Sequence, residues 1–159
     1  MARIDQARLL SAKFPFEVEV ATRFTDVDVL WHLNNVATTG ILQEGRSRFG
    51  HANDFLTLMK GYGQVVASMT VDFAAEMRHP APVHMNVGIL EVGRTSYRIV
   101  QIARQNGRIG AFAAPGGATA ATAASATDER LGWGAGRASA RAREARFLEL
   151  PAGEKDLRL

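Results

Sequence analysis

The sequence lacks cysteine entirely, and this absence excludes disulfide bonds and metal sites built from thiolates. It also lacks any run of the roughly 20 apolar residues that a membrane-spanning helix needs. The N-terminal segment MARIDQARLLSAKFPFEVEV has no long apolar stretch of the kind that a signal peptide contains. We therefore expect a soluble, cytoplasmic protein that has no membrane partner.

A strong charge of either sign is also missing, because the formal net charge is only +3. This weak positive balance suits an anionic partner, such as a phosphate-bearing cofactor, without requiring one. Proteins that bind nucleic acids usually combine a basic stripe with exposed aromatic residues. Arginines cluster between Arg137 and Arg146, but no series of aromatic residues accompanies them. We expect that run to be a solvated helix face and expect no nucleic-acid partner.

Several short runs alternate apolar and polar residues, as half-buried β-strands do. These runs cover residues 16–24, 63–77, 82–93 and 95–105. Asn106-Gly107 is a strong signal for a two-residue hairpin turn, so a further strand is expected from about Ile109. Strands joined by short turns in this way predict an antiparallel meander.

One long helix is predicted between the first and second strands, over residues 34–50 with the sequence NNVATTGILQEGRSRFG. Asn34 or Asn35 is a natural N-cap for it, and Gly50 is a natural end. A single helix packed on an antiparallel sheet is an α+β fold.

The composition changes after Gly110 to Ala, Gly, Thr and Arg, with little Val, Ile or Leu. The Ala/Thr tract has no clean period of two, and the sequence PGG at 115–117 would interrupt a central strand. We expect a core at residues 1–112 and a segment at 113–159 that completes or trails the same domain. Composition alone favours a loose or partly disordered segment. The abrupt change also raises the hypothesis that a shift of reading frame altered this tail.

The stretch RFTDVDVLWHLNN, at residues 23–35, places two aspartates, a histidine and two asparagines in an apolar run. Asp26 and Asp28 have the same parity, so an extended segment would project both to one side. The asparagines begin the expected helix, whose unpaired N–H groups and positive dipole end favour an oxyanion. A carboxylate beside such a helix start is suited to acyl transfer. We expect the intervening apolar residues to fix the loop and exclude water.

Each of these polar residues also has a purely structural explanation. Asp26 or Asp28 could cap the helix or close an Asx-turn, and His32 could orient the loop instead of transferring a proton. Glu44, further along the helix, could pair with Arg48 at i,i+4 spacing. A metal site is disfavoured because no second histidine lies nearby, and we expect no metal.

The longer stretch RFTDVDVLWHLNNVATTGILQEGR resembles the opening signature of acyl-CoA thioesterases of the 4-hydroxybenzoyl-CoA thioesterase type. That signature runs Arg-aromatic-x-Asp-x-Asp, then His-Val/Leu-Asn-Asn, then a helix with a Glu shortly before an Arg. The resemblance covers roughly residues 14–112 and includes the later VGRTSYRI. It implies a hotdog fold, in which a curved antiparallel sheet wraps one long central helix. It also implies a homodimer or homotetramer with active sites between subunits.

The resemblance implies hydrolysis of an acyl-CoA thioester to free acid and CoA, with coenzyme A as part of the substrate and no separate cofactor. It gives Asp28 the role of nucleophile or general base, and it adds His32, Asn35 and Glu44 to the catalytic set. Amides at the helix start would polarise the thioester carbonyl, and a Lys/Arg-containing surface would hold the CoA phosphates. The substrate-binding residues expected on this basis are Asp26, Trp31, Leu33, Asn34, Val36, Arg94, Thr95 and Ser96.

Two positions depart from the signature. Trp31 stands where the family usually has a glycine, which lets the backbone approach the substrate closely. Thr38 and Thr39 stand where an aromatic residue is common early in the helix. An alternative function is therefore a hotdog protein that binds an acyl thioester without hydrolysing it. The acyl group and the thiol carrier, CoA or acyl carrier protein, stay open.

Overall fold

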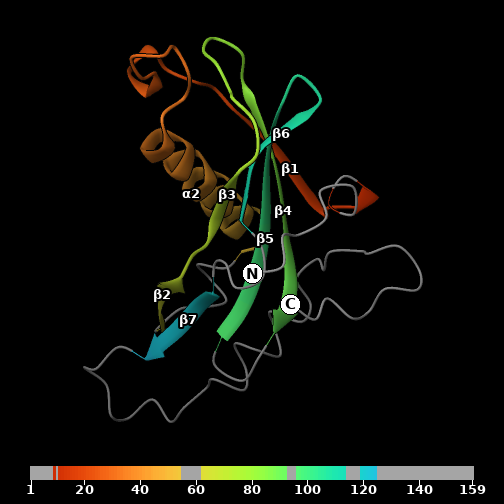
Figure 1. The fold of residues 1–159 in the computed structure, drawn as a ribbon. Coiled ribbons are helices and arrows are strands. Elements are labelled where there is room, and N and C mark those ends of the chain that lie inside the picture. Colours follow the sequence, from red (N-terminus) through yellow and green to blue (C-terminus); the bar gives the residue numbers. More distant parts are fainter. Residues whose placement is uncertain (1–8, 10, 55–61, 93–95, 114–118, 125–159) are drawn as a thin grey trace.

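The computed structural model describes residues 9, 11–54, 62–92, 96–113 and 119–124. Within these ranges lie one 3-10 turn, η1 (Phe24–Asp26), and one long helix, α2 (Asn35–Ala52). The strands are β1 (Phe16–Val20), β2 (Tyr62–Ser68), β3 (Val71–Phe73), β4 (Val83–Val92), β5 (Ser96–Gln105), β6 (Arg108–Ala113) and β7 (Thr119–Ala124). Figure 1 shows α2 lying to one side of the long central strands.

The strands form one antiparallel sheet with the order β1-β4-β5-β6-β3, to which β7 and β2 are added. β6 pairs with residues 101–105 of β5, and β7 pairs with residues 96–98 of the same strand. β3 in turn pairs with β6, and β2 pairs with β7. Next to β5, one strand position is therefore shared by β6 and β7. The position beyond it is shared by β3 and β2.

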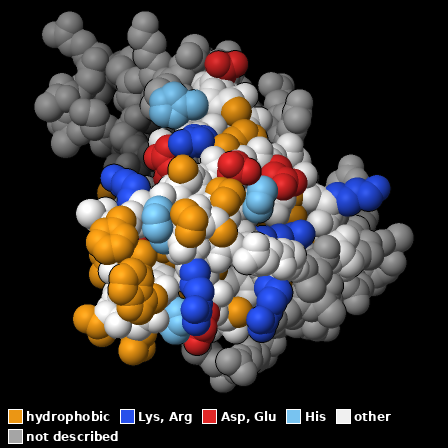
Figure 2. All heavy atoms as spheres, turned by 90° about the horizontal axis from the view of Figure 1, so that it is seen from above, with side chains coloured by type: hydrophobic (Ala, Val, Ile, Leu, Met, Phe, Trp, Pro, Cys, Tyr) orange, Lys and Arg blue, Asp and Glu red, His pale blue; other side chains and the backbone are white. Residues whose placement is uncertain are grey.

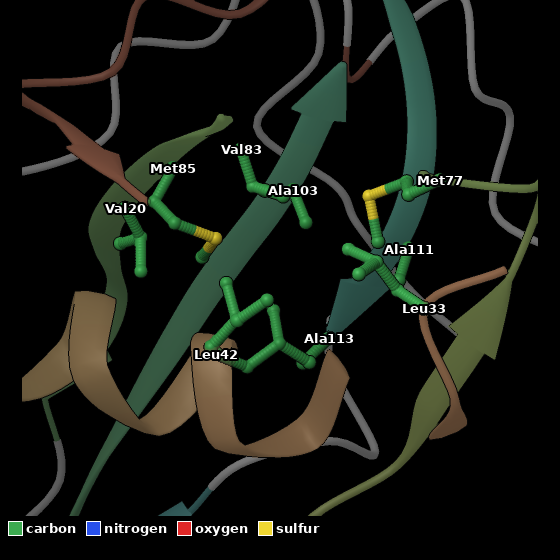
Figure 3. Close-up of a cluster of buried hydrophobic side chains, with 10 residues drawn as sticks. Val20, Leu33, Leu42, Met77, Val83, Met85, Ala103, Ala111 and Ala113 are labelled. Atoms are coloured by element: carbon green, nitrogen blue, oxygen red, sulfur yellow. The ribbon is translucent and has the colours of Figure 1, made fainter. Parts of the chain in front are cut away.

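α2 packs on β1, β4 and β5 through an apolar core. Leu42 of the helix is fully buried and points toward Met85 and Ala103 of the sheet, as Figure 3 shows. About two turns further along the helix, Phe49 is also fully buried and meets Phe16 edge to face at 5.6 Å. Each such side chain contributes about 1.5–3 kcal/mol of burial free energy. The architecture is the expected α+β hotdog fold.

The predicted hairpin at Asn106-Gly107 is confirmed. Their φ angles are 52° and 75°, both in the left-handed region that a type I′ turn needs. Gln105 and Arg108 face each other across the turn as the first strand pair.

The predicted helix end at Gly50 is wrong by two residues. α2 continues to Ala52 and is capped by Asn53, whose backbone N–H and side-chain Nδ2 both donate to the carbonyl of Phe49, at 3.2 and 2.8 Å. An amide side chain that satisfies a terminal carbonyl thus ends the helix in place of glycine.

The single strand expected over 63–77 is two strands, with a break at residues 69–70. The break follows from pairing, because the neighbouring strand is itself divided into β6 and β7. The expectation of a loose Ala/Thr tract is wrong for residues 119–124, which form β7. Ladder hydrogen bonds use backbone groups, which Ala and Thr supply as well as Val does. Residues 115–117, where an interruption was expected, lie outside the described part, as do residues 125–159.

No helix in the described ranges is long and apolar enough to cross a membrane.

Candidate functional site

The loop between η1 and α2 is closed by its own backbone. The N–H of Asp28 donates to the carbonyl of His32 at 2.8 Å, and the N–H of Trp31 donates to the carbonyl of Asp28 at 3.0 Å. Val27 and Leu33 form an isolated antiparallel bridge at the loop's base. The shape of the loop is therefore set by bonds within its own backbone.

Two further backbone bonds attach this loop to its surroundings. The N–H of Asn34 donates to the carbonyl of Asp26 at 2.9 Å, and the N–H of Leu33 donates to the carbonyl of Met77 at 2.8 Å. The second bond joins the loop to the segment that follows β3. It brings residues that are far apart in sequence to one place.

The carboxylate of Asp28 closes an Asx-turn, as the structural explanation expected. Its Oδ1 accepts the N–H of Leu30 at 2.8 Å and the N–H of His32 at 3.1 Å. Within the described residues, Oδ2 takes part in no hydrogen bond. One oxygen of Asp28 thus fixes the side chain, and the other is available to a water or a carbonyl carbon.

Asn34 is the N-cap of α2, because its Oδ1 accepts the N–H of Ala37 at 2.7 Å. The expected donors to a substrate oxygen were the amides from Leu33 to Val36. The amides of Leu33 and Asn34 are engaged by backbone carbonyls. The N–H groups of Asn35 and Val36 have no acceptor in the described part of the chain, so the donor set narrows to these two.

Four of the predicted site residues line one hollow of about 310 Å³, here called the Asp28 hollow. From the loop and α2 it is lined by Asp28, His32, Leu33, Asn35 and Thr38, from the strand end by residues 73–77, and from β6 by Gly110. Asp28 and Asn35, the first residue of the helix, therefore lie around a single space. This is the arrangement that acyl transfer requires.

Two charged residues in this region were missed from the sequence. His32 Nε2 lies 3.0 Å from Glu76 Oε2 and 2.9 Å from Arg78 Nη2, and the two charged groups are 3.2 Å from each other. Arg78 is 46 residues from His32. The only sign of Glu76 and Arg78 in the sequence is that they are charged residues at and just after the end of the alternating run at 63–77.

Glu44 and Asp26 do not join the Asp28 hollow. Both line a second hollow of about 500 Å³ on the other side of α2, here called the Glu44 hollow. Glu44 pairs with Arg48 at 2.7 Å, which confirms the i,i+4 explanation. The expectation that Asp26 and Asp28 face one side is wrong, because η1 interrupts the period of two and the carboxylate of Asp26 turns back to accept the N–H of Arg23 at 2.8 Å. The described residues hold no group of three or more His, Asp or Glu placed to bind a metal ion.

The loop's apolar side chains mostly face outward, contrary to expectation. Val29 is 93% exposed, Leu30 67% and Trp31 66%, and only Leu33 is buried. Trp31 has a φ of 64° and meets Phe24 edge to face at 6.1 Å. Figure 2 shows hydrophobic side chains gathered on one part of the face seen from above, with histidine and basic side chains beside them. The loop is thus fixed by backbone bonds and displays its apolar residues.

Of the three residues expected to contact CoA phosphates, the structure describes Ser96, which does not lie at this site. Arg94 and Thr95 lie outside the described residues. Ser96 begins β5, a strand of 10 residues, whose other end at Gln105 bonds to Arg78. Ser96 is therefore about 30 Å along the strand from the Asp28 hollow.

Arg46, the arginine of the signature, lies under α2 and not in either hollow. Its Nη1 donates to Oε1 of the fully buried Gln101 at 3.1 Å, and Gln101 Nε2 donates to the carbonyl of Leu42 at 2.5 Å. Burial lowers the pKa of Arg46, and the nearby Tyr97 partly opposes this shift. Arg46 thus links the helix to the sheet beneath it.

A family model, the Thioesterase-like superfamily, matches residues 22–131, which include the whole loop and α2. The chain belongs to this superfamily. No curated protein matches it significantly. Among solved structures, a thioesterase from Thermus thermophilus, complexed with coenzyme A and Zn, is 27% identical with a TM-score of 0.58, over 69% of this chain and 84% of that chain.

Two further structures share the fold at lower identity. The probable thioesterase YbaW from Escherichia coli is 16% identical with a TM-score of 0.69, over 82% of this chain and 98% of that chain. A predicted thioesterase from Bacillus stearothermophilus is 21% identical with a TM-score of 0.64, over 83% of this chain and 96% of that chain. These likenesses concern the fold.

Proposed function

We propose that this superfamily member hydrolyses an acyl-CoA thioester to a free acid and CoA. The observation that carries the proposal is the Asp28 hollow, which brings Asp28, with one unengaged carboxylate oxygen, together with Asn35, the first residue of α2. Hydrolysis of a thioester needs both groups, because one activates the attacking oxygen and the other stabilises the oxyanion that forms.

In the proposed reaction the thioester carbonyl oxygen accepts the N–H groups of Asn35 and Val36. The positive end of the α2 dipole adds to this stabilisation. Removing one such donor from an acyl-transfer enzyme typically costs about 2.7–4 kcal/mol of transition-state stabilisation. Asp28 then acts through Oδ2, either as general base toward water or as nucleophile toward the carbonyl carbon.

Coenzyme A is the thiol carrier that we propose, because the Thermus thermophilus thioesterase was solved with coenzyme A bound. The loop signature supports the 4-hydroxybenzoyl-CoA thioesterase type within the superfamily. Trp31, at the rim of the loop, is proposed to contact the acyl or pantetheine portion. We also propose a cytoplasmic location, where acyl-CoA is found.

We further propose that two copies pair along the β2–β3 edge. β3 ends the sheet as the described residues define it, with β6 on one side. Val65 and Val66 of β2 and Phe73 of β3 are 53%, 45% and 46% exposed. Unpaired edges with apolar side chains favour addition of another strand. Phe73 also lines the Asp28 hollow, so a second copy on this edge would help to enclose it.

The test is thiol release from a panel of acyl-CoAs by the wild type and by Asp28→Asn. The asparagine keeps an Oδ1 that can accept both loop amides, so the fold is retained while the carboxylate is lost. We expect turnover to fall at least about 100-fold. Asp54→Asn is the matched control, because it makes the same chemical change at an exposed turn after α2, and its turnover should equal that of the wild type.

Unchanged turnover in Asp28→Asn would refute the role of Asp28. A wild type that binds acyl-CoA but releases no thiol from any substrate would favour the alternative, a hotdog protein that binds acyl thioesters without cleaving them. Isothermal titration of the same panel, which does not depend on turnover, separates these outcomes.

A further inference from the structure

We propose that Glu76 and Arg78 are opposed positioning residues that act through His32. Glu76 holds the imidazole when Nε2 carries a proton, and Arg78 holds it when Nε2 is bare. As a statement about catalysis, the inference rests on the proposed thioester hydrolysis.

The geometry allows only one of the two partners to bond at a time. Glu76 Oε2 and Arg78 Nη2 approach the same ring nitrogen, Nε2 of His32, at 3.0 and 2.9 Å. A carboxylate oxygen accepts, so it needs a proton on Nε2. A guanidinium nitrogen donates, so it needs a bare Nε2. The two contacts therefore favour opposite states of Nε2, one with a proton and one without.

The segment that carries both residues is held firmly against the site. The carbonyl of Met77, between them, accepts the N–H of Leu33 at 2.8 Å. The side chain of Gln105, only 6% exposed, accepts the N–H of Arg78 at 2.7 Å and donates to the carbonyl of Arg78 at 2.8 Å. A buried amide that binds both backbone groups of one residue fixes that residue's position. The backbone of this segment is thus fixed by the fold, while the side chains of Glu76 and Arg78 are 62% and 61% exposed and meet His32 at the surface.

The chemistry gives this pair of states a use. Attack of water on the thioester carbon forms a C–O bond, and a water proton passes to Asp28. The C–S bond then breaks with its electron pair on sulfur, and the thiolate takes the proton from Nε2 of His32. Before this step, the carboxylate of Glu76 favours the ring with a proton on Nε2. After it, the guanidinium of Arg78 favours the ring with a bare Nε2. Asp28 then releases its proton to solvent, and His32 regains a proton from solvent, so both residues return to their starting states.

Apart from Asp28, His32 and Glu76, no ionisable side chain in the described part of the chain lines the Asp28 hollow. The loop contributes Asp28 itself, whose Oδ1 is held by backbone amides. α2 contributes the neutral Asn35 and Thr38, and β6 contributes Gly110. Glu76 and Arg78 are therefore the charged side chains that contact the His32 ring among the described residues.

The experiment follows the ring signals of His32 by NMR as pH is varied, in the wild type, Glu76→Gln and Arg78→Gln. The chain has four histidines, and His32→Gln assigns the signal. Removing the carboxylate should lower the titration midpoint of His32, and removing the guanidinium should raise it, because each partner favours one state of the ring. Glu91→Gln, which removes an exposed carboxylate paired with Arg98 at 3.1 Å, should leave it unchanged.

The same variants are assayed for thiol release across the pH range. The part of the kcat–pH profile that depends on His32 should shift to lower pH in Glu76→Gln and to higher pH in Arg78→Gln, while KM changes little. Arg78→Lys, which keeps the cation, should restore the wild-type midpoint. Midpoints that move in one direction for both variants, or that do not move, would overturn the proposal. If the midpoints move apart but no thiol is released, the pairing stands and the proposed hydrolysis fails.

Discussion

Replacing Trp31 separates two effects on stability at this position, the strain of its backbone and the contact of its indole with Phe24. The backbone there has a φ of 64°, a conformation that costs a residue with a Cβ about 1 kcal/mol or more relative to glycine. The indole offsets this cost through its edge-to-face contact with Phe24. Trp31→Gly removes both the strain and the contact, whereas Trp31→Ala removes the contact and keeps the strain.

The magnitudes follow from exposure. The Trp31 side chain is 66% exposed, so the aromatic contact contributes at most about 0.5–1 kcal/mol. Trp31→Ala should therefore lower the free energy of unfolding by about 0.5–1 kcal/mol. Trp31→Gly also loses the contact but relieves about 1 kcal/mol of backbone strain. Part of this gain in stability is offset because glycine gives the unfolded chain more conformational freedom. The glycine variant should be about 0.5–1 kcal/mol more stable than the alanine variant.

Urea unfolding followed by circular dichroism measures these differences. Val36, in the first turn of α2 and 83% exposed, is the control, because there alanine should be more stable than glycine by about 1 kcal/mol. The reasoning about strain is refuted if alanine is as stable as glycine at position 31. The same order of stability at both positions would refute it as well.

Two other changes test different parts of the molecule. Gln101→Leu leaves the buried guanidinium of Arg46 without its acceptor and should lower the free energy of unfolding by about 2–3 kcal/mol in the same assay, whereas a loss under about 0.5 kcal/mol would contradict the role given to this bond. Phe73→Asp places a charge on the β3 edge and should convert a dimer to monomers in sedimentation velocity. A wild type that sediments as a monomer, or a variant that remains dimeric, would remove the case for pairing along this edge.

The elements that depend on local chemistry could be predicted from the sequence. The turn at Asn106-Gly107 follows from the φ angles that those residues tolerate, and the start of α2 follows from the capping side chain of Asn34. The break between β2 and β3 could not be predicted, because it depends on where the partner strand is divided. β7 could not be predicted from side-chain alternation either, because its pairing uses backbone groups and its side chains are small.

The site divides in the same way. Asp28 and the helix start were predictable because they lie within a few residues of each other and obey turn and capping rules. Glu76 and Arg78 were not, because a bond between the backbones of Leu33 and Met77 brings them to His32. Spacing along the chain also misplaced Asp26, since one turn of 3-10 helix at Phe24–Asp26 redirects its side chain.

The outward-facing residues of the loop bear on how the site works. Backbone bonds alone fix Asp28, so Val29, Leu30 and Trp31 are not needed to hold it, yet they are 93%, 67% and 66% exposed. Apolar side chains gathered beside the carboxylate of Asp28 expose surface that water solvates poorly, and such patches mark places where another surface binds. An acyl chain or a second copy of the protein would cover this patch and dry the space around Asp28. In a drier space the amides of Asn35 and the carboxylate of Asp28 interact more strongly with a developing charge. The apolar residues of the motif would then serve the bound state, which explains why the isolated chain leaves them exposed.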